Sequence, residues 1–294
     1  MQSFSFEAID YGSPAVLKSI LSEFGLAPQS KFGQNFLINK DAQARIISIL
    51  SPLKDEKIWE IGPGMGALTH LLVNFPVRLT IFEIDKGFIN LLEKLLNGRA
   101  EIISGDFIKT VEKVDKPGDI IKIVGNLPYN SVSSILLKII ELELYPKKMV
   151  FTVQEEMADR LSAGISEKEY SSFSILVQSH FNITKAGRIN PGSFFPQPRV
   201  NSTIIEMTPS PERMRILDKG FYFNFVRLLF TSRRKTIKNN LKGLISYVKN
   251  RNIEMKMINE IFYNENLSLN QRPEEISVEK MINLCNSFTS AGKN

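Results

Sequence analysis

The chain has 294 residues, of which 43% are hydrophobic and 23% charged, values typical of a folded, water-soluble protein. Cys285 is its only cysteine and it has two histidines, which excludes an internal disulfide and argues against a thiolate or histidine metal centre. No apolar run reaches the roughly 20 residues that cross a bilayer, and the N-terminus lacks a signal-peptide pattern. We therefore expect a cytoplasmic protein with no metal centre and no segment that crosses a membrane.

The positive charge of the chain is unevenly distributed. Residues 1–210 hold 22 Lys and Arg against 23 Asp and Glu, whereas residues 211–294 hold 15 against 8. A basic segment of this kind is typical of proteins with a polyanionic partner, either nucleic acid or an anionic membrane face. Charge alone leaves an ordinary solvated helix face open as the alternative.

Short β patterns alternate with helical patterns from residue 57 onward. This alternation predicts βαβ units and therefore an α/β fold with a Rossmann-like, doubly wound parallel sheet. Helices are expected at 86–98, where Gly98 is suited to a C-cap, and at 154–164 and 171–180. The predicted strands span 57–61, 79–84, 100–104, 120–124 and 149–153, followed by two β runs near 181–188 and 201–207 that resemble an antiparallel hairpin.

A domain boundary is predicted at "TPSPERMR" (208–215), where two prolines flank a polar turn and the charge balance changes. The residues that follow are helical in pattern, with no convincing strand. We therefore expect an N-terminal extension at 1–27, a sheet domain at 28–210 and a smaller all-α domain at 211–294.

A glycine-rich loop, "EIGPGMGALT" (60–69), follows the first predicted strand. Gly62 and the two glycines after it allow a ligand to approach the backbone closely. The third glycine of a phosphate-binding G-x-G-x-x-G would fall on Ala67, and the absence of a following Lys-Ser/Thr pair excludes a P-loop.

Acidic residues follow the next two predicted strands. Glu83, in "FEID", lies about 20 residues beyond the glycine loop, where a carboxylate can hold ribose hydroxyls. Asp106, in "SGDF", can accept a hydrogen bond from an adenine amino group. Either residue alone could be a helix cap or a solvated turn. Together, at consecutive strand ends and without a pyrophosphate site, they predict S-adenosylmethionine rather than NAD as the cofactor.

The fourth strand leads into "VGNLPYNS" (124–131), at the sheet edge where α/β proteins bind ligands. A simple turn is the alternative. The Asn126 side-chain carbonyl and the Leu127 backbone carbonyl could accept the two N–H groups of an adenine amine and favour its pyramidal, nucleophilic form. Pro128 would stiffen the loop and Tyr129 would stack on the base. The motif thus predicts methyl transfer to an amine, a reaction that depends on alignment rather than on a strong base.

Nine stretches of the chain occur in the same order in one known family. They are "KFGQNFL" (31–37), "EIGPGMGALT", "FEID", "GDF", "GNLPYN" (125–130), "VQEEMADRL" (153–161), "PGSFFPQPRVNS" (191–202), "FTSRRKTIKNNL" (230–241) and "RPEEIS" (272–277). On these stretches, from about residue 28 to the C-terminus, the chain resembles the ribosomal RNA adenine N6,N6-dimethyltransferases of the small-subunit, kasugamycin-sensitivity type.

The resemblance implies roles for the residues at matching positions. Phe194 would hold the target adenine against Tyr129, although a core aromatic in a proline loop is the alternative. The implied catalytic set is Asn126, Leu127, Pro128, Tyr129 and Phe194. The implied cofactor-binding set is Gln34, Asn35, Leu37, Gly62, Glu83, Asp106 and Asn126.

A helix expected through "TSRRKTIKNNLKGL" (231–244) would carry a basic row on one face and Ile237, Leu241 and Leu244 on its buried face. The chain departs from the family pattern at Ser171 and Ser172, where glycine and a larger or basic residue are more usual, and this leaves the local RNA contacts open. The predicted RNA-binding set is Arg233, Arg234, Lys235, Lys238 and Lys242.

The resemblance implies an enzyme that dimethylates N6 of two adjacent adenines in the hairpin near the 3′ end of 16S rRNA. It would act as a cytoplasmic monomer on the small ribosomal subunit or its precursor. The related enzymes that dimethylate one 23S rRNA adenine and confer macrolide resistance are the first alternative. A catalytically silent RNA-binding assembly factor on the same fold is the second.

Overall fold

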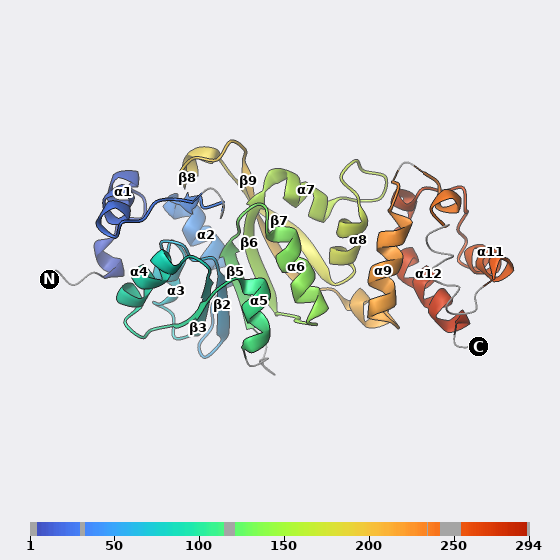
Figure 1. Cartoon of the computed structure of the whole chain (residues 1–294), viewed down its shortest axis with the longest axis horizontal. Coiled ribbons are helices and arrows are strands. Elements are labelled where there is room, and N and C mark those ends of the chain that lie inside the picture. Colours follow the sequence, from blue (N-terminus) through green and yellow to red (C-terminus); the bar gives the residue numbers. More distant parts are fainter. Residues whose placement is uncertain (1–4, 30–32, 115–120, 234, 242–253, 293–294) are drawn as a thin grey trace. The chain divides into compact units, whose positions relative to one another are not determined.

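The computed structural model describes residues 5–29, 33–114, 121–233, 235–241 and 254–292 (Figure 1). The contacts within the chain divide it into two compact units, residues 1–158 with 184–209, and residues 159–183 with 210–294. The sequence-based bounds of 1–27, 28–210 and 211–294 stay a prediction. The contact-based division also has a boundary after residue 209, but it groups residues 159–183 with residues 210–294.

A seven-stranded sheet forms the framework of the first unit, in the order β4-β3-β2-β5-β6-β9-β7. The first five of these strands run parallel, and β9 runs antiparallel to β6. The predicted α/β sheet is therefore confirmed, with each strand within two residues of its expected bounds. The strands are β2 (Lys57–Ile61), β3 (Arg78–Glu83), β4 (Glu101–Ser104), β5 (Ile121–Asn126), β6 (Lys148–Gln154), β7 (Phe181–Ile189) and β9 (Ser202–Pro209).

Helices cover both faces of this sheet (Figure 1). Alternate strand residues such as Ile58 and Val124 join the hydrophobic core with Ile46 and Leu50 of α2. Trp59 points to the opposite face, where the ring of Phe107 of α5 packs against it. The helices of this unit are α1 (Pro14–Glu23), α2 (Lys40–Leu50), α3 (Thr69–Leu72), α4 (Lys86–Leu96), α5 (Phe107–Thr110), α6 (Val132–Glu141) and the first part of α7 (Glu155–Ser162).

The N-terminal residues from Phe6 to Glu23 are folded and contribute to the core of the first unit. Phe6–Ala8 form a 3-10 turn and α1 follows, with Ser13 as its N-cap. Leu17 and Leu21 of α1 are buried in the same hydrophobic core as the sheet strands. The apolar spacing of α1 thus builds part of the first unit, although it carries no motif.

Two elements that the sequence did not predict lie at the ligand edge of the sheet. Strand β1 (Phe36–Leu37) pairs antiparallel with β8 (Phe194–Phe195), so that Phe36 lies opposite Phe195 and Leu37 opposite Phe194. This pair joins the "GQNFL" and "SFFPQP" stretches, which are far apart in sequence.

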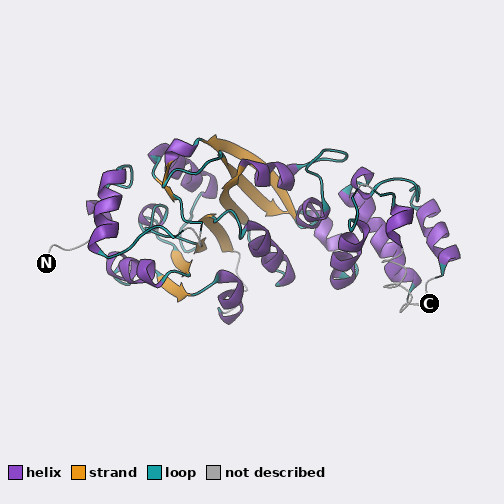
Figure 2. Ribbon diagram, turned by 45° about the horizontal axis from the view of Figure 1, so that its top comes forward, coloured by secondary structure: helices purple, strands orange, loops and turns teal. Residues whose placement is uncertain are grey.

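Helices make up the described part of residues 210–294 (Figure 2). Around Phe225 of α9, the rings of Phe221 and Phe288 pack within 5.6 Å and 5.3 Å between centroids, and Phe262 packs on Phe288. In the second unit α8 (Ser172–Gln178) lies against α9 (Lys219–Leu229), which packs on α12 (Val278–Ala291), and α12 packs on α11 (Met255–Asn264). Among the helices that the structure describes, none is both long and apolar enough to span a bilayer.

Candidate functional site

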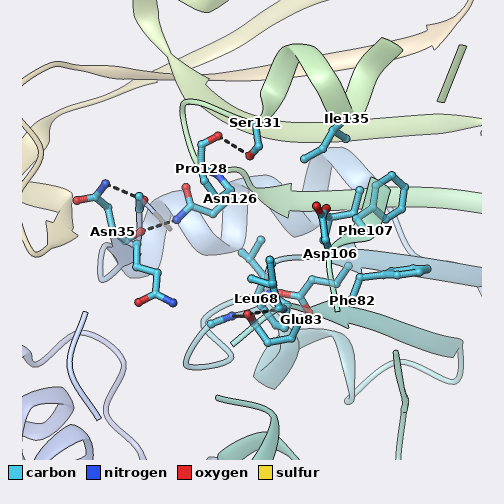
Figure 3. A pocket seen from close by; sticks show the side chains of 18 of the residues that line it. Asn35, Leu68, Phe82, Glu83, Asp106, Phe107, Asn126, Pro128, Ser131 and Ile135 are labelled. Carbon is cyan, nitrogen blue, oxygen red and sulfur yellow. Dashed lines mark hydrogen bonds between the residues drawn. The ribbon is translucent and has the colours of Figure 1, made fainter. Parts of the chain in front are cut away.

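A pocket opens at the carboxyl ends of β2, β3 and β5, beside the loop that follows β4 (Figure 3). This is the edge at which parallel sheets of this type bind ligands. Eight of the residues assigned from the sequence line the pocket: Gln34, Asn35, Leu37, Gly62, Glu83, Asp106, Asn126 and Pro128. Residues that are far apart in the chain are thus brought together around one cavity.

Glu83 is the anchor of the glycine-rich loop. Its carboxylate is 3% exposed and accepts three backbone N–H groups, from Gly64 at 3.0 Å and from Ile84 and Asp85 at 2.8 Å each. Burial nevertheless raises the pKa of Glu83 above its ordinary value, against the opposing effect of these three donors. A carboxylate has about four acceptor positions, so one of them, on Oε2, is left for a ligand hydroxyl.

Glu60 is a second buried acid in the pocket, and the sequence assigned it no role. It is 1% exposed and accepts a hydrogen bond of 2.7 Å from the Thr69 hydroxyl. Burial, together with the nearby Glu83 carboxylate, raises its pKa to about 8. At neutral pH Glu60 is therefore largely in its neutral, protonated form.

Asp106 caps α5, because its Oδ1 accepts the N–H of Ile108 at 3.0 Å. The capping alternative is thus realised, but it uses only one carboxylate oxygen and Oδ2 can still accept from a ligand. The rings of Phe82 and Phe107, 5.0 Å apart and nearly perpendicular, border the same part of the pocket. An acceptor beside an apolar wall suits a flat heteroaromatic ring with an exocyclic amine.

The orientation of Asn126 is fixed by the chain itself (Figure 3). Its Nδ2 donates a hydrogen bond of 2.6 Å to the backbone carbonyl of Asn35. Because a carbonyl can only accept, the amide nitrogen must face Asn35 and Oδ1 must face away from it. Asn126 therefore offers an acceptor at the end of β5. The preceding Gly125 is required here, since a Cβ would lie 2.6 Å from the Ile61 carbonyl oxygen.

Leu127 and Tyr129 do not line the pocket. Leu127 is 1% exposed, so its side chain belongs to the protein interior. The Tyr129 ring is half-buried, and its hydroxyl lies 2.9 Å from the hydroxyl of Ser202 at the start of β9. This bond fixes the ring beside the Asn126 loop, and burial raises the pKa of the phenol.

Phe194 lies differently from the expectation that it faces a bound base. Its ring is 3% exposed and belongs to the hydrophobic core, as the core-aromatic alternative describes. The pairing of β8 with β1 is what buries it, because Phe194 lies opposite Leu37. The neighbouring Phe195 is only partly buried, with the Lys18 ammonium 5.4 Å from its ring centre.

The basic segment is also arranged differently from one continuous helix. Residues 231–233 form a turn and the described helix begins at residue 237, with Ile237 and Leu241 buried as expected. Lys235 and Lys238 are exposed, whereas Arg234, Lys242 and Leu244 lie outside the described residues.

Arg233 is held within the second unit. Its Nε donates to the Glu274 carboxylate, Nη1 to the Lys168 carbonyl, and Nη2 to the Glu167 carbonyl at 2.8 Å. All three guanidinium nitrogens are therefore engaged, and Arg233 joins "RPEEIS" to the loop before Ser171. Its part in RNA binding stays a prediction.

Several residues of the pocket were given no role from the sequence, although they lie within or beside its motifs. Glu60 opens the quoted glycine motif, and Phe82 and Phe107 directly flank the two assigned acids. Ser131 lines the pocket and its hydroxyl donates to the Pro128 carbonyl at 2.9 Å. Within the described residues, no group of three His, Cys, Asp or Glu side chains is arranged to hold a metal ion.

Known proteins resemble the chain over nearly its full length. The family model for "Ribosomal RNA adenine dimethylase" matches residues 26–288. A protein named "Ribosomal RNA small subunit methyltransferase A" from Borreliella afzelii (strain PKo) is 42% identical over 286 residues, covering 96% of both chains. Its namesake from Treponema denticola is 38% identical over 274 residues, covering 92% of both.

Two solved structures share the fold. A dimethyladenosine transferase from Plasmodium falciparum has a TM-score of 0.75 at 24% identity and covers 86% of this chain and 97% of its own. The 23S rRNA methyltransferase ErmE has a TM-score of 0.64 at 22% identity, covering 87% and 100%. At these identities the two structures support the fold alone.

Proposed function

The chain belongs to the ribosomal RNA adenine dimethylase family, and from this premise we propose that it dimethylates N6 of two adjacent adenines near the 3′ end of 16S rRNA. The relatives that cover almost the whole chain carry a small-subunit name, which supports 16S rather than 23S rRNA as the substrate. We further propose that it acts in the cytoplasm, as a monomer, on the small subunit or its precursor.

The observation that carries the proposal is the fixed amide of Asn126. Its Nδ2 donates to the Asn35 carbonyl at 2.6 Å, which turns Oδ1 away from Asn35 and leaves it as an acceptor for a substrate amine. An adenine amine is a weak nucleophile because its lone pair is delocalised into the ring. An acceptor for its N–H favours the pyramidal form, in which the lone pair is available. Asn126 thus both holds and activates the amine, with little motion needed at the moment of reaction.

The pocket residues fit S-adenosylmethionine by the chemistry of their free acceptors. That cofactor would supply an electrophilic methyl group on a sulfonium, which departs as a neutral thioether. Glu83 would accept from a ribose hydroxyl through the remaining position on Oε2, and Asp106 would accept the adenine amine through Oδ2. Gln34, Asn35 and Leu37, which line the same pocket, would close over the methionine end.

Tyr129 would supply a stacking face for the target base, held in place by the Ser202 hydroxyl at 2.9 Å. Stacking of a base on an aromatic ring contributes about 1–3 kcal/mol, which helps to keep an extruded adenine out of its helix. The buried ring of Phe194 would support this site from behind through β1 and β8. To sandwich the base, as proposed from the family, it would have to leave the core.

The test is to incubate the protein with labelled S-adenosylmethionine and unmethylated small subunits, then to map the modified bases. We expect label on two adjacent adenines near the 3′ end of 16S rRNA, with two methyl groups on each. Large subunits incubated in parallel should stay unlabelled. Label on 23S rRNA would favour the macrolide-resistance type, and binding without label would favour the assembly factor.

A further inference from the structure

The N-terminal segment, defined here as residues 5–29, lies directly against the glycine-rich loop. Tyr11, 2% exposed, donates a hydrogen bond of 2.8 Å from its hydroxyl to the backbone carbonyl of Met65. Met65 lies between the second and third glycines of the loop. The opposite side of the same loop, at Gly62 and Gly64, faces the cofactor pocket.

The third glycine is explained by this packing. A Cβ at Gly66 would lie 3.0 Å from a ring carbon of Phe6 and 3.1 Å from the Tyr11 hydroxyl oxygen, closer than side chains normally approach. Gly66 also has φ +90, in the region that favours glycine. The glycine therefore makes room for the N-terminal segment, since the pocket is lined by other residues of the loop.

His70 fastens the next carbonyl of the loop. Its ring stacks on Tyr11 with centroids 4.3 Å apart and planes 18° from parallel, and its Nδ1 lies 3.3 Å from the Gly66 carbonyl oxygen. Burial lowers the pKa of His70, so the neutral ring is favoured. In that ring Nδ1 must carry the proton, because a carbonyl only accepts. The Tyr11–His70 pair thus binds two successive carbonyls of the loop.

The end of the N-terminal segment contacts Gln34, another residue that lines the pocket. The Gln29 backbone N–H donates to Gln34 Oε1 at 2.8 Å, and its side-chain amide donates to Asp85 Oδ2, also at 2.8 Å. Gln34 itself donates to the same Asp85 oxygen at 3.3 Å. The segment therefore holds the pocket at two separate places, the glycine loop and Gln34.

We propose that Tyr11 is a positioning residue of the cofactor site, and that the N-terminal segment sets cofactor affinity by fixing the glycine-rich loop from behind. This inference rests on the proposed function, because it assumes that the pocket binds S-adenosylmethionine. Tyr11 does not line the pocket. It acts through the Met65 carbonyl, whose position determines where Gly62 and Gly64 present their backbone to the ligand.

Tyr11→Phe tests the inference in the full-length chain, because it removes the hydroxyl and keeps the ring. Tyr170→Phe is a matched control, since Tyr170 is also buried and donates to a backbone carbonyl, that of Ile276 at 3.0 Å, in the other unit. A neutral hydrogen bond corresponds to roughly a three- to tenfold change in an equilibrium constant. We expect both variants to lower the unfolding midpoint, but only Tyr11→Phe to weaken S-adenosylmethionine binding, by about that factor, in calorimetry.

Steady-state kinetics supply a second readout. For Tyr11→Phe the KM for S-adenosylmethionine should rise, while kcat and the KM for RNA stay at wild-type values. His70→Phe is the substitute test if Tyr11→Phe does not fold. It keeps a ring that can stack on Tyr11 and loses the bond to Gly66, so it should show the same rise in the KM for S-adenosylmethionine. Wild-type cofactor affinity in a folded Tyr11→Phe variant, or in His70→Phe when the first variant cannot be purified, would overturn the inference. A wild-type protein that binds no S-adenosylmethionine would instead overturn the proposed function on which it rests.

Discussion

Replacement of Glu60 by Gln gives a sharp test of the electrostatics of the pocket. Glu60 is 1% exposed, and burial raises its pKa to about 8. A glutamine has the size of the neutral acid and keeps a carbonyl oxygen that can accept the Thr69 hydroxyl, now 2.7 Å from Oε2. The variant therefore preserves the native packing and removes one titrating proton.

The sign of the effect follows from the direction of the shift. The native pKa of about 8 lies above the reference value of 4.5, so the folded protein holds a proton that the unfolded chain releases between these values. The stabilisation that protonated Glu60 gives the folded state is fully present below the reference pKa of 4.5. It decreases as the pH rises and is lost once the pH passes the native pKa of about 8. Between them this group lowers the free energy of unfolding by up to about 1.4 kcal/mol per pH unit.

Urea unfolding of wild type and Glu60→Gln at several pH values between about 5 and 8 measures this slope. We expect the two proteins to have similar stability near pH 5 and the wild type to lose stability relative to the variant as the pH rises, so that the two curves diverge toward pH 8. Glu101→Gln is a matched control, because Glu101 accepts a hydrogen bond from Thr80 at 3.0 Å but is exposed; it should keep the wild-type slope. Parallel pH dependences for wild type and Glu60→Gln would refute the reasoning.

Three further variants test the site and its RNA partner. Asn126→Ala should abolish methyl transfer and keep an unfolding midpoint near that of wild type, since it removes one hydrogen bond at a strand end; a variant with wild-type turnover would contradict the role of Asn126. Glu83→Ala should weaken S-adenosylmethionine binding by at least roughly tenfold, the equivalent of one charge-assisted hydrogen bond, while RNA affinity stays unchanged; calorimetry with equal cofactor affinity in both proteins would rule this out. Replacing Arg234, Lys238 and Lys242 together by Gln should flatten the log–log salt dependence of subunit binding by roughly two to three units, and identical slopes would mean that these residues contact no phosphate.

The sequence was sufficient where the signal is local. Runs such as "KIWEI" and "MVFTV" consist largely of β-forming apolar residues, as is typical of strands that are buried on both faces. Each of these runs forms a strand of the parallel sheet. Because parallel strands end at one edge, the acids and amides that follow them had to converge there. This is why Glu83, Asp106 and Asn126 could be assigned to one pocket before its geometry was known.

The sequence was insufficient where distant residues decide the outcome. The burial of Phe194 depends on a two-residue pairing with Phe36 and Leu37, too short to leave a β pattern. The engagement of Arg233 depends on Glu274, and a basic residue in a polar run gives no sign of such a partner. An aromatic ring and a guanidinium group are both compatible with a contact to RNA. In this structure the ring of Phe194 lies in the hydrophobic core and Arg233 is bound to Glu274.

The packing of the N-terminal residues could not be predicted from the sequence for a related reason. Tyr11 and α1 belong to no motif, and an amphipathic helix alone does not reveal the surface that it covers. The reason for Gly66 was likewise hidden, because a glycine in a G-x-G-x-G loop is readily assigned to ligand approach, whereas the atoms nearest its missing Cβ are those of Phe6 and Tyr11.

The tether between Asn126 and the Asn35 carbonyl also implies a limit on how many times the reaction can occur on one base. Since its donor group is occupied, Asn126 presents only an acceptor to the substrate. An unmodified adenine amine has two N–H groups to offer, the monomethyl product has one, and the dimethyl product has none. Each turnover thus removes one of the hydrogen bonds that recognise the nitrogen, and after the second no donor remains. Recognition of the nitrogen by Asn126 therefore ends once both of its hydrogens have been replaced by methyl groups.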